Sequence, residues 1–166
     1  MSELTPLLIL SQALGALVGA TSAVWGEIAY VRAMRDGTVD TAERAHLHSI
    51  ANGLRFGMTL TLLASLALAV VAYTAHTALQ PALMESYWIL IVLSLLIISV
   101  SWALSRHRIS FALGSAVVFT GWWFLAYLTL GQMPSLSFSA AVAFFVVATA
   151  IFYALLRYAR LLAVPN

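Results

Sequence analysis

The sequence predicts an all-α membrane protein, a polytopic bundle of five transmembrane helices that forms a single domain over residues 1–166. Of the 166 residues, 63% are hydrophobic and 8% are charged, whereas soluble domains carry about 25% charged residues. The apolar residues fall in five runs, and a helix needs about 20 such residues to cross a bilayer. This composition excludes a water-soluble core and leaves no length for a separate soluble domain.

Polar segments and turn residues separate the five runs. We expect helices at about residues 6–31, 41–73, 85–104, 109–130 and 136–158. The first predicted span begins near Pro6, which suits the first turn of a helix. Gly15 and Gly19 form a GxxxG pattern that lets another helix approach closely. Glu27 lies on the flank of this small-residue face, roughly 7 Å before Arg32 along the helix.

The second predicted span follows Asp40, which resembles a capping box together with Glu43. Gly53 and Gly57 form a second GxxxG pattern in this span. Four polar residues lie on the opposite face, within a stripe roughly 60° wide. They are His48, Asn52, Arg55 and Thr59.

Aromatic residues mark the last three spans. Trp88 and Trp102 lie near the two ends of the third span, as interfacial anchors do. The fourth span carries Trp122 and Trp123, and we interpret this pair, with Trp88, as lipid-facing or interfacial belts. The lining of an apolar pocket is the alternative. Residues 131–135, which include a glycine and a proline, separate the fourth span from the fifth.

The arginines predict the orientation of the chain. All eight basic residues are arginines, and seven of them lie at the first loop, the third loop or the C-terminal end. The positive-inside rule then places the N-terminus outside and the C-terminus in the cytoplasm. We expect a bacterial-type inner (plasma) membrane, with the lipid bilayer as a partner. The arginines mark topology and do not form a nucleic-acid-binding surface, so we expect no nucleic acid.

The sequence lacks the residues that several kinds of chemistry require. The chain has no cysteine, which excludes disulfides, thiolate metal sites and thiol catalysis. No GxSxG, HExxH, P-loop or dinucleotide-binding glycine pattern occurs. The sequence therefore favours a non-enzymatic role.

Arg55 is the unusual member of the polar stripe, because mainly apolar residues follow it for about five turns. A guanidinium at that depth costs a few kcal/mol unless it is paired or hydrated. Helix rise places Glu27 at about the depth of Asn52. We therefore predict a Glu27–Arg55 ion pair and a path for an ion or small polar substrate along Glu27, His48, Asn52, Arg55 and Thr59. The alternative is a structural pair that fixes helix register, with Asn52 and Thr59 as interhelical hydrogen-bond partners.

Three histidines lie near the predicted cytoplasmic edge: His46, His48 and His107. Imidazole is a common ligand of haem iron and transition metals, so either is a candidate cofactor. His46 and His48 point about 200° apart on a helix and cannot bind one metal from the same face. A metal site would need one of them with His107, Glu27 or Glu43. Solvated interfacial histidines are the alternative.

Two stretches of the N-terminal half carry a family resemblance. They are Val24-Trp25-Gly26-Glu27, before a short Arg/Asp-Gly loop, and Leu54-Arg55-Phe56-Gly57-Met58-Thr59. This half resembles small bacterial integral membrane proteins of the copper-resistance D-like type. The resemblance implies a small helical membrane protein linked to copper uptake or haem binding. Members often have a histidine in the first span, where this chain has Gln12.

These features predict a small transporter or channel-like protein with a polar intramembrane site between the first two spans. A haem- or metal-binding membrane protein and a non-catalytic membrane subunit or scaffold are the alternatives. We also expect a homo-oligomer, because one small bundle would not use both GxxxG faces fully.

Overall fold

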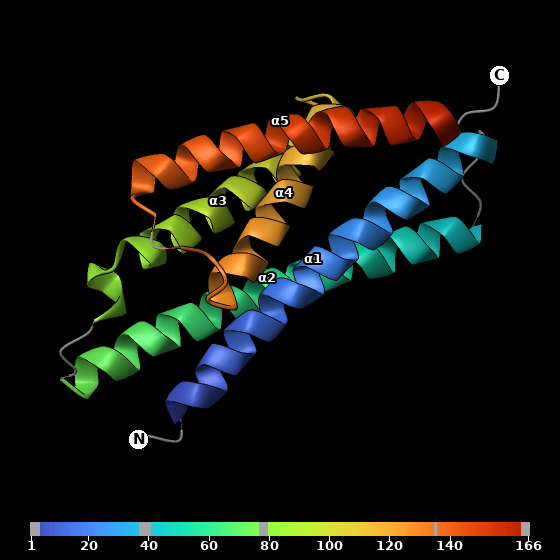
Figure 1. The fold of residues 1–166 in the computed structure, drawn as a ribbon. Helices are drawn as coiled ribbons and strands as arrows, with labels where there is room; N and C mark the ends of the chain where they lie inside the picture. The colour runs from blue at the N-terminus through green and yellow to red at the C-terminus, as the bar shows by residue number, and fades with distance from the viewer. Residues whose placement is uncertain (1–3, 37–40, 77–79, 135, 164–166) are drawn as a thin grey trace.

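The computed structural model describes residues 4–36, 41–76, 80–134 and 136–163. For residues 33–36, 41–44 and 163 it describes the backbone alone. Within these ranges the chain forms five α-helices and one short 3-10 turn, and no strand. They are α1 (Leu4–Asp36), α2 (Thr41–Thr74), η1 (Pro81–Leu83), α3 (Glu85–Ser105), α4 (Phe111–Thr129) and α5 (Phe138–Ala163) (Figure 1).

All five helices are long and apolar enough to cross a membrane. This confirms the predicted all-α architecture of five helices and is compatible with a membrane protein. The first and last helices extend further than predicted. Helix α1 continues five residues past residue 31, and α5 continues five residues past residue 158. The interior of each extension has neither proline nor glycine, so nothing ends the helix where the apolar run stops. The predicted capping residue Asp40 lies outside the described residues.

Helix α4 is the centre of the bundle. It packs against α1 on one side and against α3 and α5 on the other, while α2 packs mainly along α1 (Figure 1). Its residues Trp122 and Leu125 are almost completely buried. A Cβ atom on Gly19 of α1 would collide with the six-membered ring of Trp122, so the glycine makes room for the indole. The predicted lipid-facing position of Trp122 is therefore wrong, whereas Trp88 is exposed.

The two GxxxG patterns meet each other in one α1–α2 interface. A Cβ on Gly57 would lie 2.6 Å from the carbonyl oxygen of Gly15 and 2.9 Å from the backbone nitrogen of Gly19. A Cβ on Gly53 would collide with the Ser22 hydroxyl. Both glycine faces are thus used inside the chain, and this removes the reason for which we predicted a homo-oligomer. The oligomer itself stays a prediction.

Candidate functional site

An ion pair joins the end of the last helix to the first helix. Nη2 of Arg160 donates a hydrogen bond to Oε2 of Glu27 over 2.6 Å, and the two side chains are only 15% and 12% exposed. The same Nη2 donates to the hydroxyl of Ser115, also over 2.6 Å. One guanidinium therefore connects α1, α4 and α5. A charge-assisted bond of this length is among the stronger interactions of a protein.

Two aromatic rings complete the surroundings of the arginine. The rings of Tyr30 and Phe111 are stacked with their centroids 4.0 Å apart. The Arg160 Cζ lies 5.1 Å from the Tyr30 centroid and 5.2 Å from the Phe111 centroid, within the range of cation–π attraction. We call this group the ion-pair cluster: Glu27, Tyr30, Phe111, Ser115 and Arg160.

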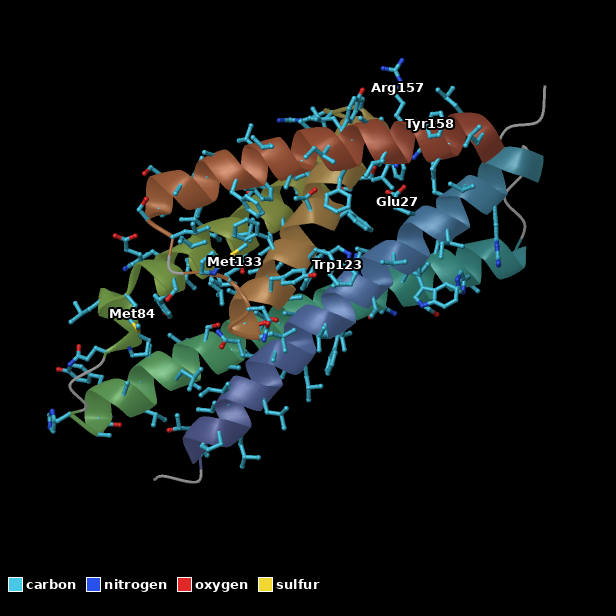
Figure 2. The ribbon with its side chains drawn as sticks, viewed as in Figure 1. Glu27, Met84, Trp123, Met133, Arg157 and Tyr158 are labelled. Atoms are coloured by element: carbon cyan, nitrogen blue, oxygen red, sulfur yellow. The ribbon has the colours of Figure 1, made fainter. Side chains whose placement is uncertain are left out.

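Helical spacing explains why these residues meet. Glu27 and Tyr30 are three residues apart on α1, and Phe111 and Ser115 are four apart on α4, so each pair shares a helix face. Arg160 approaches both faces from α5. Figure 2 shows Glu27 in the space between α1 and α5, whereas Arg157, one turn before Arg160, points away from the bundle.

The predicted ion pair between Glu27 and Arg55 is wrong. Arg55 is exposed on the outer surface of α2, with no ion-pair partner among the residues that the structure describes. The cause is the glycine interface, because packing Gly53 and Gly57 against α1 turns the opposite face of α2 outward. The polar stripe, which includes Arg55, lies on this outward face of α2.

The structure consequently does not assemble the predicted path residues into one site. His48, Asn52 and Thr59 are exposed on α2 like Arg55, while Glu27 faces α4 and α5. Close backbone packing fills the space between α1 and α2. The buried hydroxyls of Thr61 and Ser65, both on α2, donate to backbone carbonyls of that same helix. A role of the stripe in passing a solute stays a prediction.

Among the residues that the structure describes, the histidines form no cluster with other metal ligands. His46 and His48 are exposed on α2, and the His46 ring lies 6.4 Å from that of Trp25. His107 lies in the turn after α3, with a φ angle of 54°. Within the described ranges, no group of three or more histidine and carboxylate residues could hold a metal ion. The side chain of Glu43 lies outside the described part. A haem or transition-metal role stays a prediction.

A cavity of about 620 Å³ lies at the other end of the bundle, between α3, α4 and α5. We call it the end cavity. Its polar lining comes from Glu85, Ser86 and Ser137, and the rest is largely apolar, with Phe124 and Met133 on the α4 side. Oε2 of Glu85 accepts a 3.0 Å hydrogen bond from the backbone N–H of Phe138. This carboxylate thereby caps the first turn of α5, where the helix dipole favours negative charge.

A second cavity of about 580 Å³ lies between α4 and α5 and shares Phe124 and Met133 with the first. Half of its lining residues are aromatic, including Trp123 and Phe152. Nε1 of Trp123 is buried without a hydrogen-bond partner in the described part of the chain. The two adjoining spaces therefore form a largely apolar region with a few polar groups, which is the usual character of small-molecule sites.

The comparisons with known proteins give no relative: no family model matches the chain, and no curated protein and no solved structure matches it. The resemblance of the N-terminal half to the copper-resistance D-like type stays a prediction.

Proposed function

We propose that the protein is a small membrane transporter whose solute binds in the end cavity and whose passage is closed at the opposite end by the ion-pair cluster. The observation that carries this proposal is the placement of the two sites. The cavity is lined by Ser137, which directly precedes α5, and by Ala141 in the first turn of that helix. The ion pair holds the other end of α5 at Arg160. The same two helices, α4 and α5, thus border an open space at one end and a closed contact at the other.

The ion pair is well placed to act as a gate. Contact between α1 and α5 is slight apart from this pair, whereas α5 packs more extensively on α4. Separating Glu27 from Arg160 would therefore free the end of α5 with little other packing to break. If a lost pairing costs about 1.4 kcal/mol, the population of the separated state rises about tenfold.

The lining of the end cavity favours an amphiphilic solute with a cationic or hydrogen-bonding end. Glu85 supplies negative charge, and Ser86 and Ser137 supply hydroxyl groups. Phe124 and Met133 supply apolar and polarisable surface for the remainder of the solute. With the arginine-rich end in the cytoplasm, as the positive-inside rule predicts, the cavity opens to the outside.

The test is ethidium influx into proteoliposomes loaded with DNA, where ethidium entry raises fluorescence. We expect the wild-type protein to admit ethidium faster than empty liposomes. Ser137→Trp at the exposed cavity rim should slow the influx toward that of empty liposomes. Leu83→Trp is the matched control, because Leu83 is 80% exposed and does not line this cavity.

The gate is tested in the same assay. Glu27→Gln should speed ethidium influx, while Arg157→Gln should leave it unchanged because Arg157 is exposed. A wild-type rate equal to that of empty liposomes would refute transport of this solute class and favour a scaffold role. Equal rates for Ser137→Trp and Leu83→Trp would refute the end cavity as the entry site.

A further inference from the structure

A second polar site lies on the outer surface of the bundle, where α2 and α3 leave a groove between them. The two helices contact each other little. The groove encloses about 220 Å³, and its polar lining comes from Arg55, Thr59, Ser101 and Trp122. We call it the α2–α3 groove. It is separate from the ion-pair cluster and from the end cavity, which other residues line.

Three polar side chains of this groove have no hydrogen-bond partner among the described residues. They are Arg55, Thr59 and Ser101, and all three are exposed. Trp122 is only 1% exposed, and its Nε1 is buried without a partner there. The Cε3, Cζ3 and Cη2 atoms of this indole face Gly19 of α1. Nε1 therefore lies on the opposite edge of the ring, away from α1.

The positive charge of Arg55 favours an anionic ligand for the groove. Among the described residues, Arg55 is the only charged one in the lining, and no described carboxylate pairs with it. A buried or lipid-facing guanidinium is costly without a counter-charge. Phosphate oxygens suit it well, because the planar guanidinium can donate two parallel hydrogen bonds to them.

A second copy of this chain fits the groove poorly. Of the acidic side chains that the structure describes, Glu27 is already paired with Arg160, and Glu85 lies at the other end of the bundle. A symmetric contact through this face would also bring two Arg55 side chains together, and like charges repel.

The depth of Arg55 suits a lipid headgroup. Polar residues such as His48 and Asn52 precede Arg55 on α2, and the mainly apolar run from Phe56 to Tyr73 follows it. Arg55 therefore lies at the edge of the apolar part of the helix. Arginine side chains at such positions extend toward the interface and draw headgroups and water toward them. Basic pockets between transmembrane helices are known to bind anionic headgroups.

We propose that the α2–α3 groove binds the phosphate of an anionic phospholipid from the leaflet on the arginine-rich side. Arg55 pairs with the phosphate, and the Thr59 and Ser101 hydroxyls donate hydrogen bonds to its oxygens. The acyl chains lie along the apolar part of the groove, at Ile97 and Ile98.

The test is native mass spectrometry of the full chain in neutral detergent, titrated with phosphatidylglycerol or with phosphatidylcholine. We expect the wild type to bind phosphatidylglycerol about tenfold more tightly, because the zwitterionic headgroup adds a competing cation. Arg55→Gln should abolish this preference, and Arg55→Lys should keep part of it. Arg157→Gln is the matched control and should keep it fully, because Arg157 is an equally exposed arginine outside the groove.

Two further measurements distinguish a bound lipid from other occupants of the groove. Thr59→Val retains the shape of an exposed groove side chain and removes its hydroxyl, so it should weaken phosphatidylglycerol binding by about threefold. Inorganic phosphate should bind more weakly than the lipid. Tighter binding of inorganic phosphate, a dimer that excludes lipid, or an unchanged lipid preference in Arg55→Gln would each overturn the proposal. Because none of these measurements uses ethidium flux, their outcome is independent of the transport proposal.

Discussion

Arg160 and Glu27 are 133 positions apart in the sequence, yet their Nη2 and Oε2 atoms lie 2.6 Å apart. The contact joins the last helix of the bundle to the first, and Ser115 of the central helix accepts a second hydrogen bond from the same nitrogen. Because α1 and α5 otherwise touch little, this pair is the main link between the C-terminal end of α5 and the first helix.

We predict that Glu27 and Arg160 stabilise the fold as a unit. Glu27→Gln and Arg160→Gln should each lower the free energy of unfolding by about 2 kcal/mol, because each leaves a mostly buried charge without its partner. The double variant should lose less than the sum of the two, by a coupling of about 1–2 kcal/mol. Chemical unfolding in detergent, followed by tryptophan fluorescence, measures all three.

Arg157→Gln is the control for this cycle, since Arg157 is an exposed arginine one turn away on the same helix. It should change the free energy of unfolding by less than about 0.5 kcal/mol. Strictly additive losses for the Glu27 and Arg160 variants would show that the pair is not coupled.

The α1–α2 interface gives a second prediction. Gly57→Ala should destabilise the protein by about 1–3 kcal/mol, because its new methyl group would meet backbone atoms of Gly15 and Gly19 that cannot move aside. Gly26→Ala is the matched control in α1, since its Cβ would meet only Ile50 Cγ2 at 3.6 Å, an ordinary contact distance. Thermal unfolding in detergent compares them. Equal midpoints would contradict close packing at Gly57.

The sequence was sufficient to predict the five helices, because a lipid environment requires every spanning segment to be long, apolar and helical. It also located the close helix contacts at Gly15, Gly19, Gly53 and Gly57, since small residues four positions apart allow backbones to approach. The two patterns meet each other in a single interface, and this pairing follows from three-dimensional packing that the spacing alone does not contain.

The partner of Glu27 could not be predicted in the same way. Helix rise gives the depth of a residue in the membrane, and both Arg55 and Arg160 lie toward the arginine-rich end. The choice between them depends on which faces of α1 turn toward α2 and α5, and this is set by contacts between helices far apart in the sequence. The hydrophobic pattern likewise did not distinguish the buried Trp122 from the half-buried Trp123 beside it.

The orientation of the chain gives a third prediction, and the absence of cysteine makes it simple to test. Ser139→Cys at the start of α5 should react with a membrane-impermeant maleimide in intact cells. Ser105→Cys at the end of α3 should react only after lysis, because the positive-inside rule places that end in the cytoplasm. Both serines are exposed, and the replacement is nearly isosteric. The reverse labelling pattern would invert the predicted topology and the side to which the end cavity opens.

The last prediction concerns Trp122 of α4, which is almost completely buried and fills the space beside Gly19 of α1. Trp122→Ala should lower the free energy of unfolding by about 3–5 kcal/mol, because the neighbouring helices cannot close a gap of this size. Trp88→Ala is the matched control, since Trp88 is 52% exposed and its indole bonds only to the carbonyl of Ala82. The Trp88→Ala change should lower the free energy of unfolding by about 1 kcal/mol, which is the usual contribution of one hydrogen bond. Urea titration in a neutral detergent compares the two variants, and similar losses would mean that Trp122 is not central to the packing of α4 against α1.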